Sequence, residues 1–158
     1  TKETIAPLAQ ALDIEPVVDE RVIEAENQFE GTKVDRNSLL QPQNLQRLYN
    51  PLKPSWGEPY VNQVRRMRAA VASVHRRLED IARSEKFDVV DGVIVSHQLP
   101  IWVTRLDAED RSLVHDPRRR ECALASSTTL TFENGSLVDV GYIDIAEDLQ
   151  PAKGVAGA

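Results

Sequence analysis

The chain has 158 residues, of which 41% are hydrophobic and 28% are charged, and its formal net charge at pH 7 is -6. This length and composition are typical of one globular domain with a real hydrophobic core. The negative charge argues against a broad nucleic-acid surface, because such a surface needs cations to neutralise phosphates. A small phosphorylated ligand is still allowed, since it requires only a few local cations.

Three features of the sequence bear on where the protein works. No stretch approaches the ~18 consecutive apolar residues of a membrane span, and Thr1–Thr4 lacks the pattern of a signal peptide. The single cysteine, Cys122, cannot form an internal disulfide. We therefore expect a cytoplasmic protein that makes no membrane contact.

Residues 1–59 predict one helix and a long irregular region. Ile5, Leu8 and Leu12 recur at helical spacing, and residues 16–23 follow as a short extended piece. The stretch 24–59 is polar and contains four prolines. A loop of this length in a compact domain is usually functional, so we predict a lid or pocket region there.

Residues 60–150 predict most of the regular structure. An apolar stripe indicates a helix over 60–81, and the β-branched run 89–95 indicates a strand buried on both faces. A helix begins near Pro100, and Asn134-Gly135 predicts a hairpin. We expect a three-layer α/β/α sandwich with a mostly parallel sheet over residues 1–150, and a flexible tail over 151–158.

Ser96-His97-Gln98 occupies the predicted junction between the buried strand and the next helix. Ligands of open α/β sheets bind at the carboxyl ends of strands, and the first amides of a helix favour an anion. A histidine there can donate to a phosphoryl oxygen. Alternatively, His97 simply bonds a nearby carbonyl at the strand end.

Acidic residues cluster where the irregular region begins, at Glu24, Glu26 and Glu30. A carboxyl group beside a phosphate site can act as a general acid. The alternative is that all three are solvated loop acids. No histidine or cysteine spacing typical of a metal site is present, so we predict no metal or other cofactor.

Several short segments occur in a distinctive order. Val22-Ile23-Glu24 is followed by Phe29-Glu30-Gly31, then by Gly57-Glu58-Pro59 and Arg66, and later by Ser96-His97. Together they resemble the leucine-x-glutamate, Gly-Glu-Ser and second-histidine segments of the histidine phosphatase (phosphoglycerate mutase-like) superfamily. The resemblance covers nearly all of residues 1–145, and the order of the segments carries its specificity.

The resemblance implies roles for individual residues. His97 would be the second histidine, which contacts the transferring phosphoryl group. Glu24 would protonate the leaving oxygen and later activate water, and Glu26 is a second candidate for that acid. Ser96, Gln98 and Glu58 would line the phosphate or substrate site with Glu26. Gln98 replaces the glycine that is usual in the family, which either crowds the phosphate pocket or adds a donor to it.

The family's phosphorylated histidine belongs to an N-terminal Arg-His-Gly segment, which by resemblance would precede Thr1. We therefore expect a fold that is incomplete at its N-terminus and that is not a stable active monomer by itself. The missing central strand would come from a complementing N-terminal fragment, from a swapped partner in a homodimer, or from a rearranged sheet.

The resulting functional hypothesis is a phosphomonoester hydrolase that acts on a small phosphorylated substrate through a phosphohistidine. Mutase activity is compatible with the same residues. The alternative is a non-catalytic module with the same fold that binds a phosphorylated ligand or has a regulatory role.

Overall fold

The computed structural model describes residues 1–25, 57–116 and 119–146. The chain forms α1 (Lys2–Leu12), the short 3-10 helix η1 (Glu20–Val22), α4 (Tyr60–Glu85), α5 (Gln98–Ala108), β1 (Ser127–Glu133) and β2 (Ser136–Ile143). None of the helices in these ranges is long and apolar enough to cross a membrane. Most of the predicted region 24–59, and the predicted tail 151–158, lie outside the described residues.

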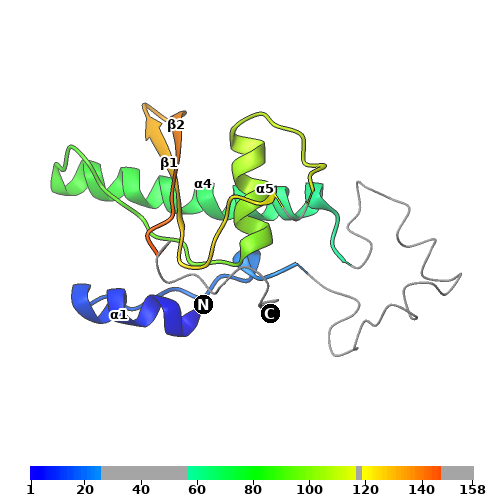
Figure 1. The fold of residues 1–158 in the computed structure, drawn as a ribbon. Coiled ribbons are helices and arrows are strands. Elements are labelled where there is room, and N and C mark those ends of the chain that lie inside the picture. The colour runs from blue at the N-terminus through cyan, green and yellow to red at the C-terminus, as the bar shows by residue number, and fades with distance from the viewer. Residues whose placement is uncertain (26–56, 117–118, 147–158) are drawn as a thin grey trace, which may run out of the picture.

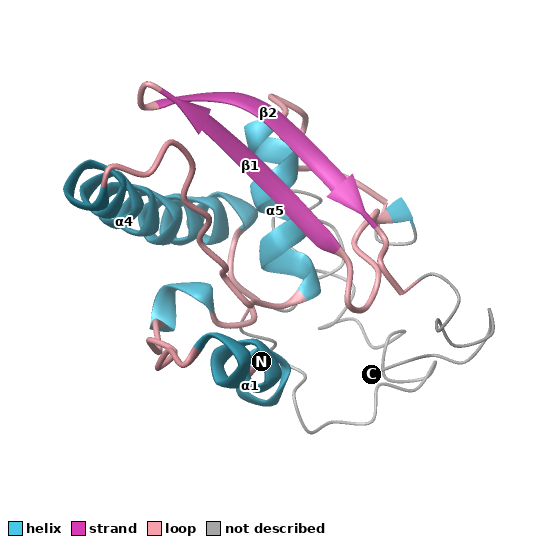
Figure 2. Cartoon of the chain, turned by 90° about the vertical axis from the view of Figure 1, so that its left-hand side faces the viewer, coloured by secondary structure: helices cyan, strands magenta, loops and turns pink. Residues whose placement is uncertain are grey.

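The long helix α4 organises the described structure. α5 crosses it, η1 packs against it, and the hairpin lies alongside both helices (Figures 1 and 2). The predicted apolar stripe supplies the contact, because its members Tyr60, Val64 and Met67 are buried. α4 ends at Glu85, and the following C-cap residue, Lys86, adopts a left-handed conformation with φ 57°.

The core lies where α5 meets α4. Tyr60 and Val64 of α4 pack with Val103 of α5, which is fully buried. On another side of α5, Trp102 and Leu106 are buried with Cys122, which belongs to the loop that follows the helix. α5 is therefore fixed on two sides, and its N-terminal end, where His97 lies, has a defined position.

The predicted hairpin is confirmed. β1 and β2 are antiparallel, and they are joined by Asn134 and Gly135, whose φ values are 49° and 79°. Positive φ at both turn positions is the requirement of a type I′ turn, which asparagine and glycine meet at low cost. The register shifts between Thr131 and Phe132, as in a β-bulge.

The predicted strand over residues 89–96 is not formed. The described residues contain one sheet of two antiparallel strands, so they do not confirm the mostly parallel sheet expected around that segment. A strand exists only where a neighbour bonds to it, and no described segment pairs with this one. The segment instead packs on α4 at Gly92, where an added Cβ would lie 2.8 Å from Leu78 Cδ1. Val89 and Val93, expected to be buried, are exposed.

Candidate active site

The two residues proposed for chemistry, Glu24 and His97, lie together. Glu24 Oε2 is 3.6 Å from His97 Nδ1, and the two side chains are 44% and 39% exposed. His97 is the N-cap residue of α5, directly before a helix as the sequence predicted, whereas the strand expected to end beside it is not formed. The pair is therefore accessible to a ligand while each member remains within reach of the other.

The first turn of α5 is suited to an anion. The side chain of His97 does not cap the amides of Gln98 and Leu99, Pro100 has no amide hydrogen, and the turn contains no acidic residue. Unpaired amides and the helix dipole together favour negative charge at a helix N-terminus. His97 and Glu24 thus stand beside a position at which a phosphoryl group would find donors.

Ser96 ties the two parts of the site together. Its hydroxyl donates to the carbonyl oxygen of Val22 at 2.7 Å. This bond joins the residue before His97 to a residue two positions before Glu24. Ser96 is therefore a link between the backbones that carry the two side chains.

Gln98 bonds away from His97. Its Nε2 donates to the carbonyl oxygen of Cys122 at 2.7 Å. The amide thereby fastens the loop after α5 to the start of the helix. In the structure, the Gln98 donor is therefore engaged in holding a loop.

Glu58 forms an ion pair with Arg66 of α4, with Oε2 2.9 Å from Nη2. Arg66 Nε also donates to both carboxylate oxygens of Glu58, at 3.1 and 3.0 Å. The remaining nitrogen, Nη1, donates to the carbonyl oxygens of Arg21 and Ile23, each at 2.7 Å. Glu58 thus orients an arginine that grips the segment leading into Glu24.

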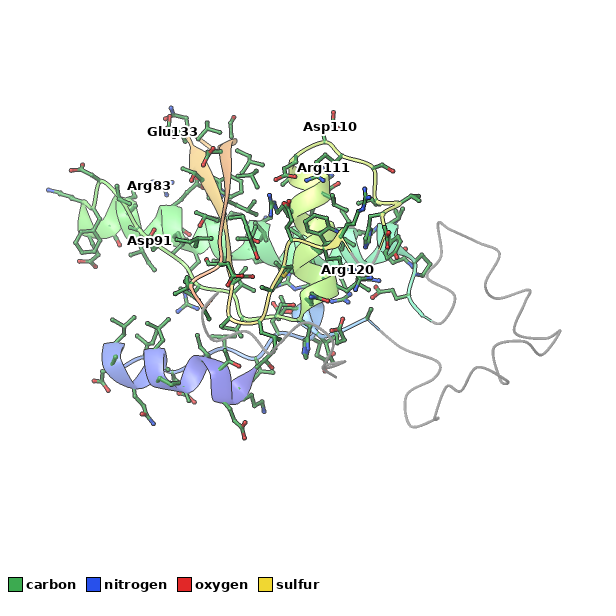
Figure 3. The ribbon with its side chains drawn as sticks, viewed as in Figure 1. Arg83, Asp91, Asp110, Arg111, Arg120 and Glu133 are labelled. Carbon is green, nitrogen blue, oxygen red and sulfur yellow. The ribbon has the colours of Figure 1, made fainter. Side chains whose placement is uncertain are left out.

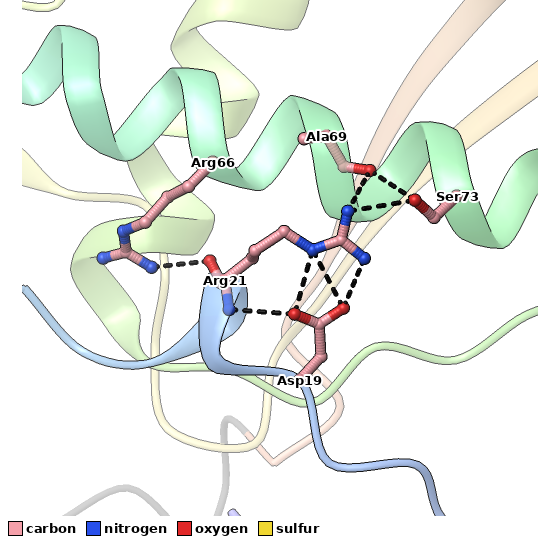
Figure 4. Close-up of polar contacts among 5 residues, drawn as sticks. All are labelled: Asp19, Arg21, Arg66, Ala69 and Ser73. Atoms are coloured by element: carbon pink, nitrogen blue, oxygen red, sulfur yellow. Dashed lines mark hydrogen bonds and ion pairs between the residues drawn. The ribbon is translucent and has the colours of Figure 1, made fainter.

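A second arginine holds the same segment. The side chain of Arg21 donates to the carbonyl oxygen of Ala69 at 2.9 Å and to the Ser73 hydroxyl at 3.0 Å (Figure 4). The other edge of the guanidinium forms an ion pair with the Asp19 carboxylate, with Nη2 2.6 Å from Oδ2. Hydrogen bonds from Arg21 lower the pKa of Asp19. Nothing in the sequence pattern predicted this contact, since it depends on how η1 packs on α4.

The loop after α5 contains another histidine, His115, whose ring makes defined hydrogen bonds. His115 Nδ1 is 2.8 Å from the carbonyl of Leu113, and Arg120 Nε donates to His115 Nε2 at 3.0 Å. The ring packs against Tyr60 and Trp102. This bonding requires a neutral imidazole with its proton on Nδ1.

Burial lowers the pKa of His115, and the charge of Arg120 acts in the same direction. Figure 3 shows Arg120 beside the N-terminal half of α5, whereas Arg111 lies at the other end of the helix. Burial also raises the pKa of the Cys122 thiol. Both groups therefore stay uncharged near neutral pH.

Of the candidates from the sequence, the structure brings Glu24, His97 and Ser96 together. Glu26 and Glu30 lie outside the described residues. In the part of the chain that is described, no group of three or more metal-ligating side chains could hold a metal ion. An open groove lies between α1 and residues 13–18, and neither Glu24 nor His97 lines it.

Comparison with known proteins places the chain in a family. The model of the histidine phosphatase superfamily (branch 1) matches residues 1–144, so the chain belongs to that superfamily. Membership supports the predicted α/β class and, in general terms, a phosphatase or mutase-like function.

Two curated relatives come from Mycobacterium tuberculosis, and both are described as uncharacterized proteins. The relative from strain ATCC 25618 / H37Rv is 43% identical over 143 residues, and the relative from strain CDC 1551 / Oshkosh is 42% identical over 143 residues. In each case the match covers 89% of this chain and 66% of the relative. The chain therefore spans about two thirds of the length of the curated relatives that it matches. No solved structure matches it.

Proposed function

We propose that the protein is a phosphomonoester hydrolase of the histidine phosphatase type, in which Glu24 is the general acid and His97 binds the transferring phosphoryl group. The observation that carries the proposal is the pairing of Glu24 with His97 at the open N-terminal end of α5. The family membership of residues 1–144 supports the same chemistry.

The mechanism has two steps. In the first, a histidine nitrogen attacks phosphorus while the ester P–O bond breaks, and the Glu24 carboxyl group gives its proton to the departing oxygen. In the second, the Glu24 carboxylate takes a proton from water as the water oxygen attacks the phosphohistidine, which releases inorganic phosphate. His97 and the first amides of α5 would stabilise charge on the phosphoryl oxygens in both steps.

The attacking histidine is proposed to lie outside the 158 residues. Of the three histidines present, His75 stacks on Phe132 with ring centroids 4.4 Å apart, and its Nε2 is 3.7 Å from Glu79. His115 uses both ring nitrogens in hydrogen bonds. The curated relatives extend beyond the matched region by about a third of their length, which leaves room for a further histidine.

The test uses the complete gene product and a chromogenic aryl phosphate. Glu24→Gln should lower kcat about a hundredfold or more, because a positioned general acid typically contributes that much. Glu20→Gln is a matched control, since Glu20 is an exposed acid of the same segment. Equal rates for wild type and Glu24→Gln would refute the assignment. Phosphate binding without any turnover would support the non-catalytic alternative.

A further inference from the structure

The backbone just before Glu24 is held by side chains from two separate elements. Arg66 of α4 donates from one nitrogen to the carbonyl oxygens of residues 21 and 23, each at 2.7 Å. Ser96 donates to the carbonyl oxygen of residue 22, also at 2.7 Å. Three consecutive carbonyls are therefore fixed by long-range contacts, and the next residue is the proposed acid.

Arg66 is itself held in one orientation. Its Nε donates to both carboxylate oxygens of Glu58, and its Nη2 lies 2.9 Å from Oε2 in an ion pair. The side chains of Arg66 and Glu58 are only 17% and 19% exposed. A guanidinium is planar and has five donors in fixed directions, so fixing one edge also fixes the direction of Nη1. Lysine could not reproduce this geometry, because its ammonium group has no rigid fork.

A second attachment prevents the segment from pivoting about Arg66. The guanidinium of Arg21 binds α4 further along the helix, at Ala69 and Ser73 (Figure 4). The segment before Glu24 is thus attached to α4 at two successive places. A rotation that carried Glu24 away from His97 would have to break one of them.

We propose that Arg66, oriented by Glu58, is a positioning residue that holds Glu24 at its distance from His97 and from the departing oxygen. This inference rests on the proposed function. Arg66 makes its contacts to backbone carbonyls and to Glu58, so its effect on the reaction passes through Glu24. Removing Arg66 frees the carbonyls of residues 21 and 23 and lets the carboxyl group shift. A displacement of about 1 Å at a catalytic group costs on the order of a hundredfold in rate.

The consequence depends on the leaving group. An alkoxide is a poor leaving group and needs the proton of Glu24 as the P–O bond breaks, whereas a dinitrophenolate departs readily without it. Loss of positioning should therefore slow the hydrolysis of alkyl phosphates strongly and that of dinitrophenyl phosphate weakly. Loss of folded protein would slow both substrates by the same factor.

The experiment measures kcat/KM for a series of phosphate monoesters of rising leaving-group pKa, with the complete gene product. This parameter covers the reaction through departure of the leaving group, so the later hydrolysis of the phosphohistidine does not affect it. The variants are Arg66→Met, Glu24→Gln, and the two combined. Arg65→Met is the matched control, because Arg65 is the exposed neighbour on α4 and forms no ion pair with any described residue.

Arg66→Met is expected to lower kcat/KM about 10- to 100-fold for alkyl phosphates and less than about threefold for dinitrophenyl phosphate. Glu24→Gln should give the same steepened dependence on leaving-group pKa, and the double variant should be no slower on alkyl phosphates than Glu24→Gln alone. Arg65→Met should match the wild type.

Each other outcome has a distinct meaning. A uniform loss across the series in Arg66→Met would overturn the positioning role and leave the proposed function intact. Additive losses in the double variant would show that Arg66 acts independently of Glu24, and would also overturn it. A wild-type protein that hydrolyses no monoester would overturn the proposed function, and the positioning role with it.

Discussion

Replacing Gln98 by the family's usual glycine should destabilise the protein. Two losses add in Gln98→Gly. The bond from Nε2 to the Cys122 carbonyl disappears, which costs about 0.5–1 kcal/mol because the residue is exposed and water replaces part of the contact. Glycine in the first turn of α5 costs about a further 0.5–1 kcal/mol relative to alanine, which is the cost of glycine inside a helix.

The sum is about 1–2 kcal/mol in the free energy of unfolding, which for a chain of this size corresponds to a Tm about 2–8 °C lower. Gln98→Ala separates the two contributions, since alanine keeps the helix propensity and loses only the bond. Gln98→Ala should therefore lie about halfway between wild type and Gln98→Gly. Urea unfolding followed by circular dichroism measures all three.

The same variants test what the Gln98 amide does. If it binds a phosphate rather than the loop, Gln98→Ala will keep the wild-type stability and will weaken the binding of inorganic phosphate. That result would refute the tether. The structure predicts the reverse, which is a stability loss with phosphate affinity little changed.

Three other predictions concern the core around α5 and α4. Because burial lowers the pKa of His115 in the folded protein, the unfolded state binds the proton more tightly, and the stability that the neutral ring contributes above pH ~6.5 declines as the pH falls towards the folded-state pKa. His115→Phe should therefore flatten the fall in urea midpoint below pH ~6.5. An unchanged slope would contradict the assignment. The Cys122 thiol, whose pKa burial raises, should react with iodoacetamide far more slowly in the native protein than in urea, and equal rates would show that it is accessible. Gly92→Ala should cost about 1–3 kcal/mol through the contact with Leu78, and the loss should shrink in the Gly92→Ala, Leu78→Ala double variant if sterics cause it.

Local sequence patterns were sufficient for the elements that depend on local physics. The helix α4 was predicted from a stripe of apolar residues, because such a stripe needs only a partner surface to become buried. The hairpin was predicted from Asn134-Gly135, because the turn itself selects those residues. Neither inference required knowledge of the rest of the fold.

The segment 89–96 shows where local patterns fail. Its valines and isoleucine have the intrinsic preferences of a buried strand, yet strand formation depends on a neighbour elsewhere in the chain. Without a paired neighbour among the described residues, the segment lies against α4 and leaves Val89 and Val93 exposed. The composition of this segment shows its intrinsic preference, but it does not show whether another segment pairs with it.

The candidate site divides in the same way. The order of the family-like segments was enough to single out Glu24 and His97, which the structure brings within 3.6 Å. The contacts that place these two side chains were not predictable from the sequence. Arg66 donates to carbonyls more than forty residues away in the sequence, and Ser96 donates to a carbonyl at a still larger separation. Backbone carbonyls carry no sequence signature, so only the fold identifies which of them an arginine reaches.

The most direct test of the proposed function is to trap the phosphorylated enzyme. The complete gene product is mixed with an aryl phosphate labelled on phosphorus, quenched in base within milliseconds, and mapped by mass spectrometry. The account predicts a burst of phenol close to the enzyme concentration, together with a base-stable, acid-labile phosphohistidine at a residue outside these 158. The decay of this phosphohistidine should be slower in Glu24→Gln. Turnover without any phosphohistidine, or a phosphoryl group on His97 itself, would contradict it.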